Sequence, residues 1–484
     1  MTPFLRVNDE RLFETCTLRI AAVRCDVRTN NRSLLDTLSK WRTAGPPYTP
    51  DRFRLSVTVR AEFGSSTYDT PHFRGLGHVV FASWGDACVV VFDILARRAS
   101  AIVSQRCAAD AGFWNTVLLP IAIGVLGAAV GAVPVHCACL SQHGNGVLIA
   151  GASGAGKSTL AVALALRGMP LVSDDWTYLR CDGTGNTLTA YGVHAPVKLL
   201  PDAAEHFPAL RASRPAIALN GELAYETDPA VTFGVAVDTV SRPAVFVFLR
   251  RLKSGPPRLL GLETSVATRY LIDGAERLPR ELREVSARRE NVLRKVSSLP
   301  CYLFEYSGNP HSGARALELA LRARTTEALR SPAGLPHSFS LDMPHPPDLL
   351  HRFVEAPTTG LIAIGGNRLL VQTNDVALLH ALRPLEPLST LANRHLWRCR
   401  LLVDNRTPAR PASTPPRAMT CSSEGRIAVK HGARTFIYMD LVRREVIAFF
   451  DPALPSRRSA QLFRALVNDM LARIPDDSSV RAGS

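Results

Sequence analysis

The chain has 484 residues, of which 46% are hydrophobic and 20% charged. This balance is typical of globular proteins and excludes an intrinsically disordered chain. The formal net charge is +15, and only six of the basic residues are lysines. The arginines are scattered and no nucleic-acid-binding motif accompanies them, so we expect solvated surface charge, in part facing an acidic ligand or partner, and no nucleic-acid partner.

Cysteine usage and the N-terminus both predict a cytoplasmic protein. The ten cysteines contain no CxxC pair. Cys137 and Cys139 stand one residue apart, which suits buried thiols on one face of a strand better than a metal site. No disulfide framework is indicated, and the first residues lack the apolar core of a signal peptide.

The chain repeats itself. Residues 27–31 (VRTNN) and 34–38 (LLDTL) return 344 positions later as 371–375 (VQTND) and 378–382 (LLHAL). Further on the offset becomes 347. At this offset Gly85 matches Gly432, Asp93 matches Asp440, and Arg97 matches Arg444. The extra positions fall in a loop rich in Pro, Ser and Thr, where insertions are tolerated. We predict two copies of a small α+β domain, each a strand, helix, strand, long loop, hairpin, strand and helix.

The repeat sets the predicted domain map. Copy one occupies residues 1–115, with hairpin strands at 78–82 and 87–92, and copy two occupies 349–476. A different domain lies between them at 116–330, followed by a Pro-rich linker at 331–348, and residues 477–484 form a disordered tail. The copies are interpreted either as a folding and oligomerisation module or as a substrate-recognition module.

One segment, residues 117–135, contains no charged residue and is long enough to span a membrane. It contains Pro120, Pro134 and three glycines, and it runs directly into a predicted strand. We therefore expect a buried helix next to the central sheet, with membrane contact as the less favoured alternative.

The strongest motif is GASGAGKS at residues 151–158, which fits the pattern GxxxxGK[ST]. A strand-like run at 146–150 precedes it, and a helix-like run at 159–166 follows. This order lets backbone N–H groups and a helix N-terminus surround phosphate groups. The motif predicts ATP and Mg²⁺ binding, with Lys157 reaching the β- and γ-phosphates and Ser158 as a Mg²⁺ ligand. The predicted nucleotide-binding residues are Gly151, Ala152, Ser153, Gly154, Ala155, Gly156, Lys157, Ser158 and Thr159.

Two adjacent carboxylates, Asp174 and Asp175, follow the next predicted strand. One can accept a proton from an attacking hydroxyl while the other holds Mg²⁺ through water; a helix cap or turn pair is the structural alternative. Upstream, His136 lies on an apolar strand that we expect to pair with the strand before the loop, through a turn at 143–146. A lone histidine on such a strand is more often structural than functional.

These residues resemble the catalytic domain of the HPr kinase/phosphorylase family and its relatives. The features that carry the resemblance are His136 on a strand, a glycine loop after a hairpin, a helix that ends in Arg167-Gly168, and Asp174-Asp175. The resemblance covers residues 116–330 and is strongest over 134–200. It implies an α/β domain of the HPr kinase/PEP carboxykinase type, flanked in this chain by the two α+β copies.

The resemblance also implies roles for individual residues. Asp174 would be the catalytic acid/base, assisted by Lys157, and Asp175 would lie on the Mg²⁺ side. His136 would orient or charge the aspartate. Lys198, in a Pro-Val-Lys run, and Arg250, after an apolar strand, are weaker candidates for substrate contact.

The chain departs from HPr kinases in three places. Thr159 stands where they carry an acidic residue, their Glu-x-Arg-Gly segment is absent, and the repeat is not their usual N-terminal domain. HPr itself and phosphorylase activity are therefore not the expected substrate and reaction.

We predict an ATP-dependent kinase that phosphorylates a serine- or threonine-type hydroxyl of a protein or peptide. A small-molecule kinase, acting for example on free serine, and a nucleotide-binding regulator without transfer activity are the alternatives. Homo-oligomerisation is compatible with the resemblance, since relatives often oligomerise.

Overall fold

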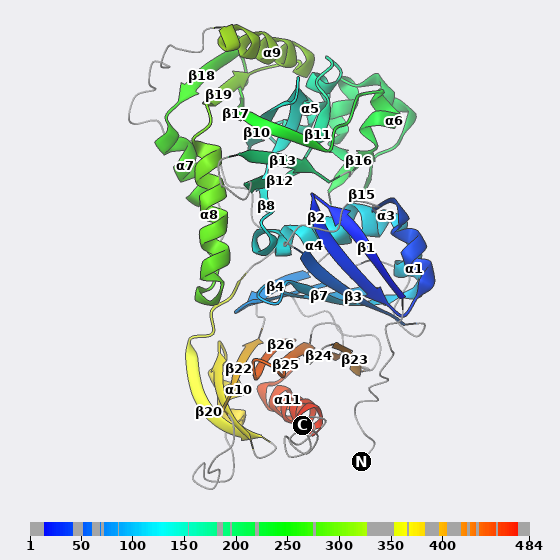
Figure 1. Ribbon diagram of the computed structural model, residues 1–484, viewed down its shortest axis with the longest axis vertical. Coiled ribbons are helices and arrows are strands. Elements are labelled where there is room, and N and C mark those ends of the chain that lie inside the picture. Colours follow the sequence, from blue (N-terminus) through cyan, green and yellow to red (C-terminus); the bar gives the residue numbers. More distant parts are fainter. Residues whose placement is uncertain are drawn as a thin grey trace.

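The computed structural model describes residues 14–41, 52–60, 68, 72–85, 87–152, 154–181, 187–193, 196–217, 222–273, 277–326, 353–364, 367–382, 396–403, 418–423, 426–431, 435–451 and 454–472. The predicted linker at 331–348 and the predicted tail at 477–484 lie outside these residues. The chain folds into mixed α/β structure with a central sheet and two seven-stranded sheets, stacked along the long axis (Figure 1).

The N-terminal sheet has the strand order β1-β2-β3-β7-β6-β5-β4. Its strands are β1 (Glu14–Ile20), β2 (Val23–Thr29), β3 (Arg52–Arg60), β4 (His72–Leu76), β5 (Val79–Trp84), β6 (Cys88–Asp93) and β7 (Arg98–Ser104), with α1 (Arg32–Thr37) after β2. The hairpin β5–β6 lies close to its predicted position. The sheet begins with a further hairpin, β1–β2, which the predicted element order lacks. Its turn residues, Ala21 and Ala22, have positive φ without being glycine, so the sequence carries no ordinary turn signal there.

The C-terminal sheet repeats that order as β20-β21-β22-β26-β25-β24-β23. Its strands are β20 (Thr358–Ile364), β21 (Asn367–Thr373), β22 (Leu396–Val403), β23 (Ala418–Ser423), β24 (Arg426–His431), β25 (Thr435–Asp440) and β26 (Glu445–Phe450). Two helices, α10 (Val376–Ala381) and α11 (Ser456–Leu471), belong to this unit. The two sheets also share the left-handed residue in the turn before their last strand, Arg97 and Arg444.

The two sheets flank the central domain in sequence but not in space. The N-terminal sheet lies between the central and C-terminal sheets (Figure 1). Buried side chains of both seven-stranded sheets form one apolar cluster, in which Phe81 stacks on Phe436 and Phe449. The faces that carry no helices thus pack against each other.

The central sheet is nine-stranded, with the path β11-β9-β10-β17-β13-β12-β8 and β19 and β18 beside β17. Its strands are β8 (Val133–His136), β9 (Ala138–Gln142), β10 (Asn145–Gly151), β11 (Leu171–Ser173), β12 (Trp176–Cys181), β13 (Leu188–Gly192), β17 (Val240–Arg251), β18 (Arg258–Leu262) and β19 (Cys301–Tyr306). A small sheet adds β14 (Val197–Leu199), β15 (Ala216–Ile217) and β16 (Leu223–Thr227), next to α6 (Pro229–Phe233).

Helices cover both faces of the central sheet. On one face, α5 (Lys157–Ala165) and α9 (Pro310–Thr326) share a core. On the other, α7 (Thr264–Asp273) and α8 (Arg283–Ser297) belong to a core that continues into the N-terminal sheet. This continuity arises because one helical segment contacts both sheets.

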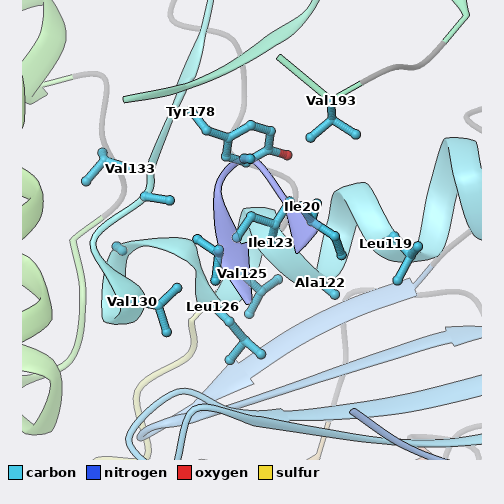
Figure 2. Close-up of a cluster of buried hydrophobic side chains, with 14 of the residues drawn as sticks. Ile20, Leu119, Ala122, Ile123, Val125, Leu126, Val130, Val133, Tyr178 and Val193 are labelled. Atoms are coloured by element: carbon cyan, nitrogen blue, oxygen red, sulfur yellow. The ribbon is translucent and has the colours of Figure 1, made fainter. Parts of the chain in front are cut away.

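That segment contains α2 (Gln105–Ala109), α3 (Ala111–Phe113), a π-helical turn η2 (Trp114–Leu118), α4 (Leu119–Leu126) and η3 (Gly127–Val130). Leu119, Ala122 and Ile123 of α4 share a core cluster with Ile20 of β1 and Tyr178 of β12, and Figure 2 shows Ile20 close to Ile123 with the Tyr178 ring above them. Within the described residues, the helix Ala111–Val130 is long and apolar enough to cross a membrane, and 78% of its most apolar window is buried inside the protein. The predicted buried helix is therefore present, and it bridges two sheets.

Candidate functional site

The glycine loop begins where β10 ends. β10 lies between antiparallel β9 and parallel β17, and α5 follows the loop. Gly154 and Gly156 have φ of 77° and 86°, a region that residues with a Cβ avoid. A Cβ on Gly156 would also lie 3.1 Å from the Tyr306 hydroxyl. The chain therefore has a strand, a glycine loop and a helix in that order; Ser153 lies outside the described residues.

Lys157, the first residue of α5, is buried. Its Nζ donates to the backbone carbonyls of Gly151 at 3.1 Å and Ala152 at 3.3 Å. Burial lowers the pKa of Lys157, and the negative charges of Asp175 and Asp174 partly offset this. The ammonium group is thus held within the loop and within electrostatic reach of the carboxylate pair.

Asp174 follows β11 and is strongly desolvated. Burial, and then repulsion from Asp175, raise its pKa to about 7, although Ser158, the Lys198 backbone N–H and Lys157 act in the opposite direction. Oδ2 accepts from the Lys198 N–H at 3.4 Å, whereas Oδ1 is buried without a hydrogen-bond partner among the described residues. A carboxyl group with this pKa can gain or lose a proton near neutral pH.

Asp175 is more exposed than Asp174, with 61% of its side chain accessible. The surrounding protein reduces its solvation, which raises the pKa, but the hydrogen bond and charge of His136, followed by Lys157 and Lys198, hold the pKa of Asp175 below its usual value. His136 Nε2 lies 2.5 Å from Asp175 Oδ1. Asp175 is therefore the carboxylate of the pair that stays ionised.

The strand that carries His136 differs from the prediction. The apolar run divides at Cys137: β9 pairs with β10 through the predicted turn at 143–146, whereas His136 ends β8, which pairs with β12. The Cys137 carbonyl accepts from Thr177 Oγ1 at 2.8 Å, and the Cys137 N–H bonds Val135 O at 2.9 Å. This bend sets His136 opposite Trp176 and beside Asp175 rather than in the strand next to the loop. Cys137 and Cys139 are both fully buried, as predicted.

The two weaker candidates each have an acidic partner. Lys198 on β14 pairs with Glu222 through Nζ, so it reaches Asp174 through its backbone N–H. Arg250 lies near the carboxyl end of β17, one residue beyond the Leu249 that pairs with Gly151, and its Nε donates to Glu305 at 2.8 Å. The structure thus brings the Lys198 backbone to the carboxylate pair. It pairs Arg250 of β17 with Glu305 of β19.

The donor set at this site suits a cation that brings its own ligands. Among the described residues, no three His, Cys, Asp or Glu side chains lie close enough to hold a metal ion. Mg²⁺ usually binds one or two carboxylates together with water and substrate phosphates. Asp174 has an unpartnered oxygen and Asp175 an exposed side chain, so the pair fits Mg²⁺ bound with a nucleotide better than a metal held by protein alone.

A pocket of about 260 Å³ opens beside the carboxylate pair. Its lining includes the polar residues Asp174, Asp175 and Lys198 and the apolar residues Val117, Pro120 and Val193. Sequence reasoning misses this apolar wall, because it assigns residues 117–135 to a uniform buried helix. The available signal is Pro120, which lacks the N–H that a regular helix requires.

The fold and site together define an α/β domain with a strand–glycine loop–helix unit beside two adjacent carboxylates, Asp174 and Asp175. No protein-family model matches the chain. Two curated relatives match part of it: HPr kinase/phosphorylase from each of two strains of Treponema pallidum, both 40% identical over 65 residues. The match covers 13% of this chain and 20% of each relative, so the chain spans about one fifth of their length.

A solved structure is also similar to part of the chain. It is the Hpr(Ser) kinase/phosphatase from Coxiella burnetii, with 17% sequence identity and a TM-score of 0.24 over 40% of this chain and 97% of that one. The sequence match over 65 residues is what makes part of this chain similar to HPr kinase/phosphorylase.

Proposed function

We propose that this chain is an ATP-dependent kinase of the HPr-kinase-like type, which transfers the γ-phosphoryl group to a serine- or threonine-type hydroxyl of a protein or peptide. The observation that carries the proposal is Asp174: a desolvated carboxyl with a pKa of about 7 and a buried, unpartnered Oδ1, beside the glycine loop. The local similarity to HPr kinase/phosphorylase supports the same class of reaction.

In this proposal the loop 151–158 holds the phosphates of ATP, and Lys157 exchanges its backbone carbonyl partners for phosphate oxygens. Ser158 and Asp175 hold Mg²⁺, which would neutralise charge on the phosphates. His136 keeps Asp175 ionised for this task.

Asp174 acts as the general base. Its Oδ1 takes the proton of the acceptor hydroxyl while the hydroxyl oxygen bonds to the γ-phosphorus, and the bond to the β–γ bridging oxygen breaks to release ADP. The two neighbouring carboxyls have pKa values shifted in opposite directions, a pattern that suits a division between proton transfer and cation binding.

The proposal extends to the rest of the chain. We place the catalytic domain at residues 116–330 and interpret the two seven-stranded sheets, 1–115 and 349–476, as copies of one duplicated domain. The enzyme is proposed to act in the cytoplasm on a protein or peptide partner, with homo-oligomerisation compatible with the scheme.

Transfer from γ-labelled ATP with Mg²⁺ into a fractionated extract of the source cells tests the proposal. Wild type is compared with Lys157→Ala and Asp174→Asn, and with Lys253→Ala and Asp202→Asn, which change exposed residues. Wild type and both controls should label a protein or peptide. Lys157→Ala and Asp174→Asn should lose labelling by about 100-fold or more, as expected when an electrostatic or general-base group is removed.

Other outcomes separate the alternatives. Label found only in low-molecular-mass fractions identifies a small-molecule kinase. A wild type that binds ATP but releases only free phosphate is a nucleotide-binding protein without transfer activity, and the kinase proposal then fails.

A further inference from the structure

The pocket beside Asp174 is lined by two chemically different kinds of residue. Asp174 and Asp175 contribute carboxylates. Val117 and Pro120 of the bridging helical segment, together with Val193 and Val237, contribute apolar side chains. None of the described residues of the loop 151–158 lines this pocket. The carboxylate pair therefore has the glycine loop on one side and a separate, largely apolar cavity on another.

Two of the lining residues, Thr116 and Val117, belong to a π-helical turn. In η2 the N–H of Leu119 bonds the carbonyl of Trp114, one residue further back than in an α-helix. Pro120 follows directly and has no N–H for the ladder, which explains why the helix widens here. Such turns are frequent at functional sites. Here the turn brings Thr116 and Val117 to the pocket.

Hydrogen bonds within the segment and from both neighbouring units hold this turn in place. Trp114 Nε1 donates to Cys107 O of α2 at 2.8 Å, and Trp41 Nε1 of the N-terminal unit donates to Asn115 Oδ1. On the other side, the Tyr178 hydroxyl of β12 donates to Pro120 O at 3.0 Å. Figure 2 shows the Tyr178 ring above α4, with Val193 nearby. The wall of the pocket is thus fixed jointly by the N-terminal sheet and by the strand that follows Asp175.

We infer that this pocket binds the acceptor, with its hydroxyl at Asp174 and an apolar substituent against Val117, Pro120 and Val193. The inference rests on the proposed kinase function and adds the chemical class of the acceptor. A volume of about 260 Å³ lies below the roughly 300–1,000 Å³ of drug-sized ligand sites. The pocket therefore admits a hydroxyl-bearing group with one apolar neighbour, presented by a peptide or carried by a free alcohol of that size.

The same inference gives the N-terminal sheet a part in acceptor specificity. Val117 belongs to the segment packed on that sheet, and its half-buried side chain lines the pocket. A larger or more polar residue at this position changes which acceptor fits, without contact to the glycine loop. Val117 is thus assigned as a specificity-determining residue.

The test uses the full-length chain and three variants. Val117→Trp fills the space beside Val117 in the pocket. Val117→Thr keeps the shape of the side chain but replaces a methyl group by a hydroxyl. Val442→Trp makes the same large change at a side chain that is 75% exposed. Each is assayed for label transferred from γ-labelled ATP to the extract acceptor, for phosphate released to water, and for ATP affinity. Acid-precipitable and ultrafiltrable label are counted separately, which distinguishes a peptide from a free alcohol.

Val117→Trp should lower transfer to the acceptor by about 10-fold or more, because a single methylene group in an apolar pocket already discriminates by about that much and the indole ring is far larger. Phosphate release to water and ATP affinity should stay at the wild-type level, because water still reaches Asp174. Val117→Thr should raise the acceptor KM with kcat unchanged, and Val442→Trp should behave as wild type.

The pocket assignment fails if Val117→Trp transfers phosphate to the acceptor as fast as wild type and Val117→Thr has the wild-type acceptor KM. The kinase proposal would remain intact in that case. If Val117→Trp fails to fold, the KM of Val117→Thr decides alone. A wild type that labels no acceptor while it hydrolyses ATP defeats the kinase proposal, and the acceptor assignment with it.

Discussion

Asp174 in the candidate site and Asp93 between the two seven-stranded sheets are both carboxylates withdrawn from water, yet their pKa values move in opposite directions. Asp93 Oδ2 accepts from Tyr438 at 2.8 Å and from Arg443 at 3.0 Å, and Oδ1 accepts from the Ala96 N–H at 2.8 Å. Burial raises the pKa of Asp93, but His78, Arg443 and these hydrogen bonds outweigh it and hold the pKa below its usual value.

Asp174 has far fewer partners and keeps one oxygen free. The comparison teaches that burial alone does not decide the role of a carboxylate. Where donors surround it on all sides, as at Asp93, the charge is fixed and ties two sheets together. Where a partner is missing, the protonation state stays open, which is the property that proton transfer requires.

The largest expected effect is on stability, in Asp93→Ala. This change leaves Arg443, His78 and the Tyr438 hydroxyl without their shared acceptor at a buried position, and breaking a buried ion pair in this way typically costs about 3–5 kcal/mol. We expect a clear fall in the urea midpoint for the transition of the seven-stranded sheets. Asp202→Ala, at an exposed position, should change the midpoint little. Equal midpoints for wild type and Asp93→Ala would mean that Asp93 does not tie the sheets together.

In contrast to Asp93→Ala, Asp174→Asn is expected to increase the free energy of unfolding above neutral pH. A carboxyl with a folded-state pKa of about 7 and an ordinary pKa of 3.8 binds its proton more tightly in the folded state, so the stability of wild type falls as pH rises from about 4 to 7. Asparagine carries no charge and avoids this loss. At pH 8 the variant should therefore have a higher melting temperature than wild type, with a free energy of unfolding larger by up to about 4 kcal/mol at 1.36 kcal/mol per pKa unit. Near pH 4 the two proteins should be equally stable.

Thermal melting of both proteins at pH 4, 6 and 8 tests this prediction, with Asp202→Asn as the control. A difference that is constant across this range would show that Asp174 is ionised throughout, as Asp93 is. The proposed general base would then have an ordinary pKa. Asp93 itself should contribute its pH dependence below about pH 5, with stability lost as pH falls, because its folded-state pKa is lowered.

The same contrast explains what the sequence predicts and what it does not. Local features carry their own signals. Asn30 in the first repeat bonds the backbone of Val59 in both directions, at 3.0 and 2.8 Å, and Asn374 bonds Val403 in the same way, at 2.8 and 2.9 Å. The residues repeated in the sequence thus make the same hydrogen bonds in both copies. The glycine loop is local in the same sense, since its strand, turn and helix are consecutive.

Features that join distant segments carry no such signal. The sequence marks Asp93 and Asp440 only as matching positions of a repeat, because their partners depend on how the two sheets face each other. The site shows the same limit. Asp174 and Asp175 are visible as a pair, but the bend at Cys137 that turns His136 toward Asp175 depends on pairing between β8 and β12. The pocket lining at Val117, which we propose contacts the acceptor, depends on a helix that crosses the predicted domain boundary at 115.

The smallest of the three effects is expected for Tyr438→Phe, which removes one hydrogen bond to Asp93 and keeps the ring. Tyr438 occupies the position that Val91 has in the first copy, so only one of the two sheets supplies this donor. A hydrogen bond to a charged group contributes about 1.5–3 kcal/mol, and Asp93 retains Arg443 and the Ala96 N–H, so the loss should lie at the lower end. A double-mutant cycle with Asp93→Ala isolates the contact: the effect of Tyr438→Phe should nearly vanish in the Asp93→Ala background, because the acceptor is already gone. Additive effects would instead place the contribution of Tyr438 in its packing, and Asp93 would then owe its low pKa to Arg443 and His78 rather than to complete hydrogen bonding.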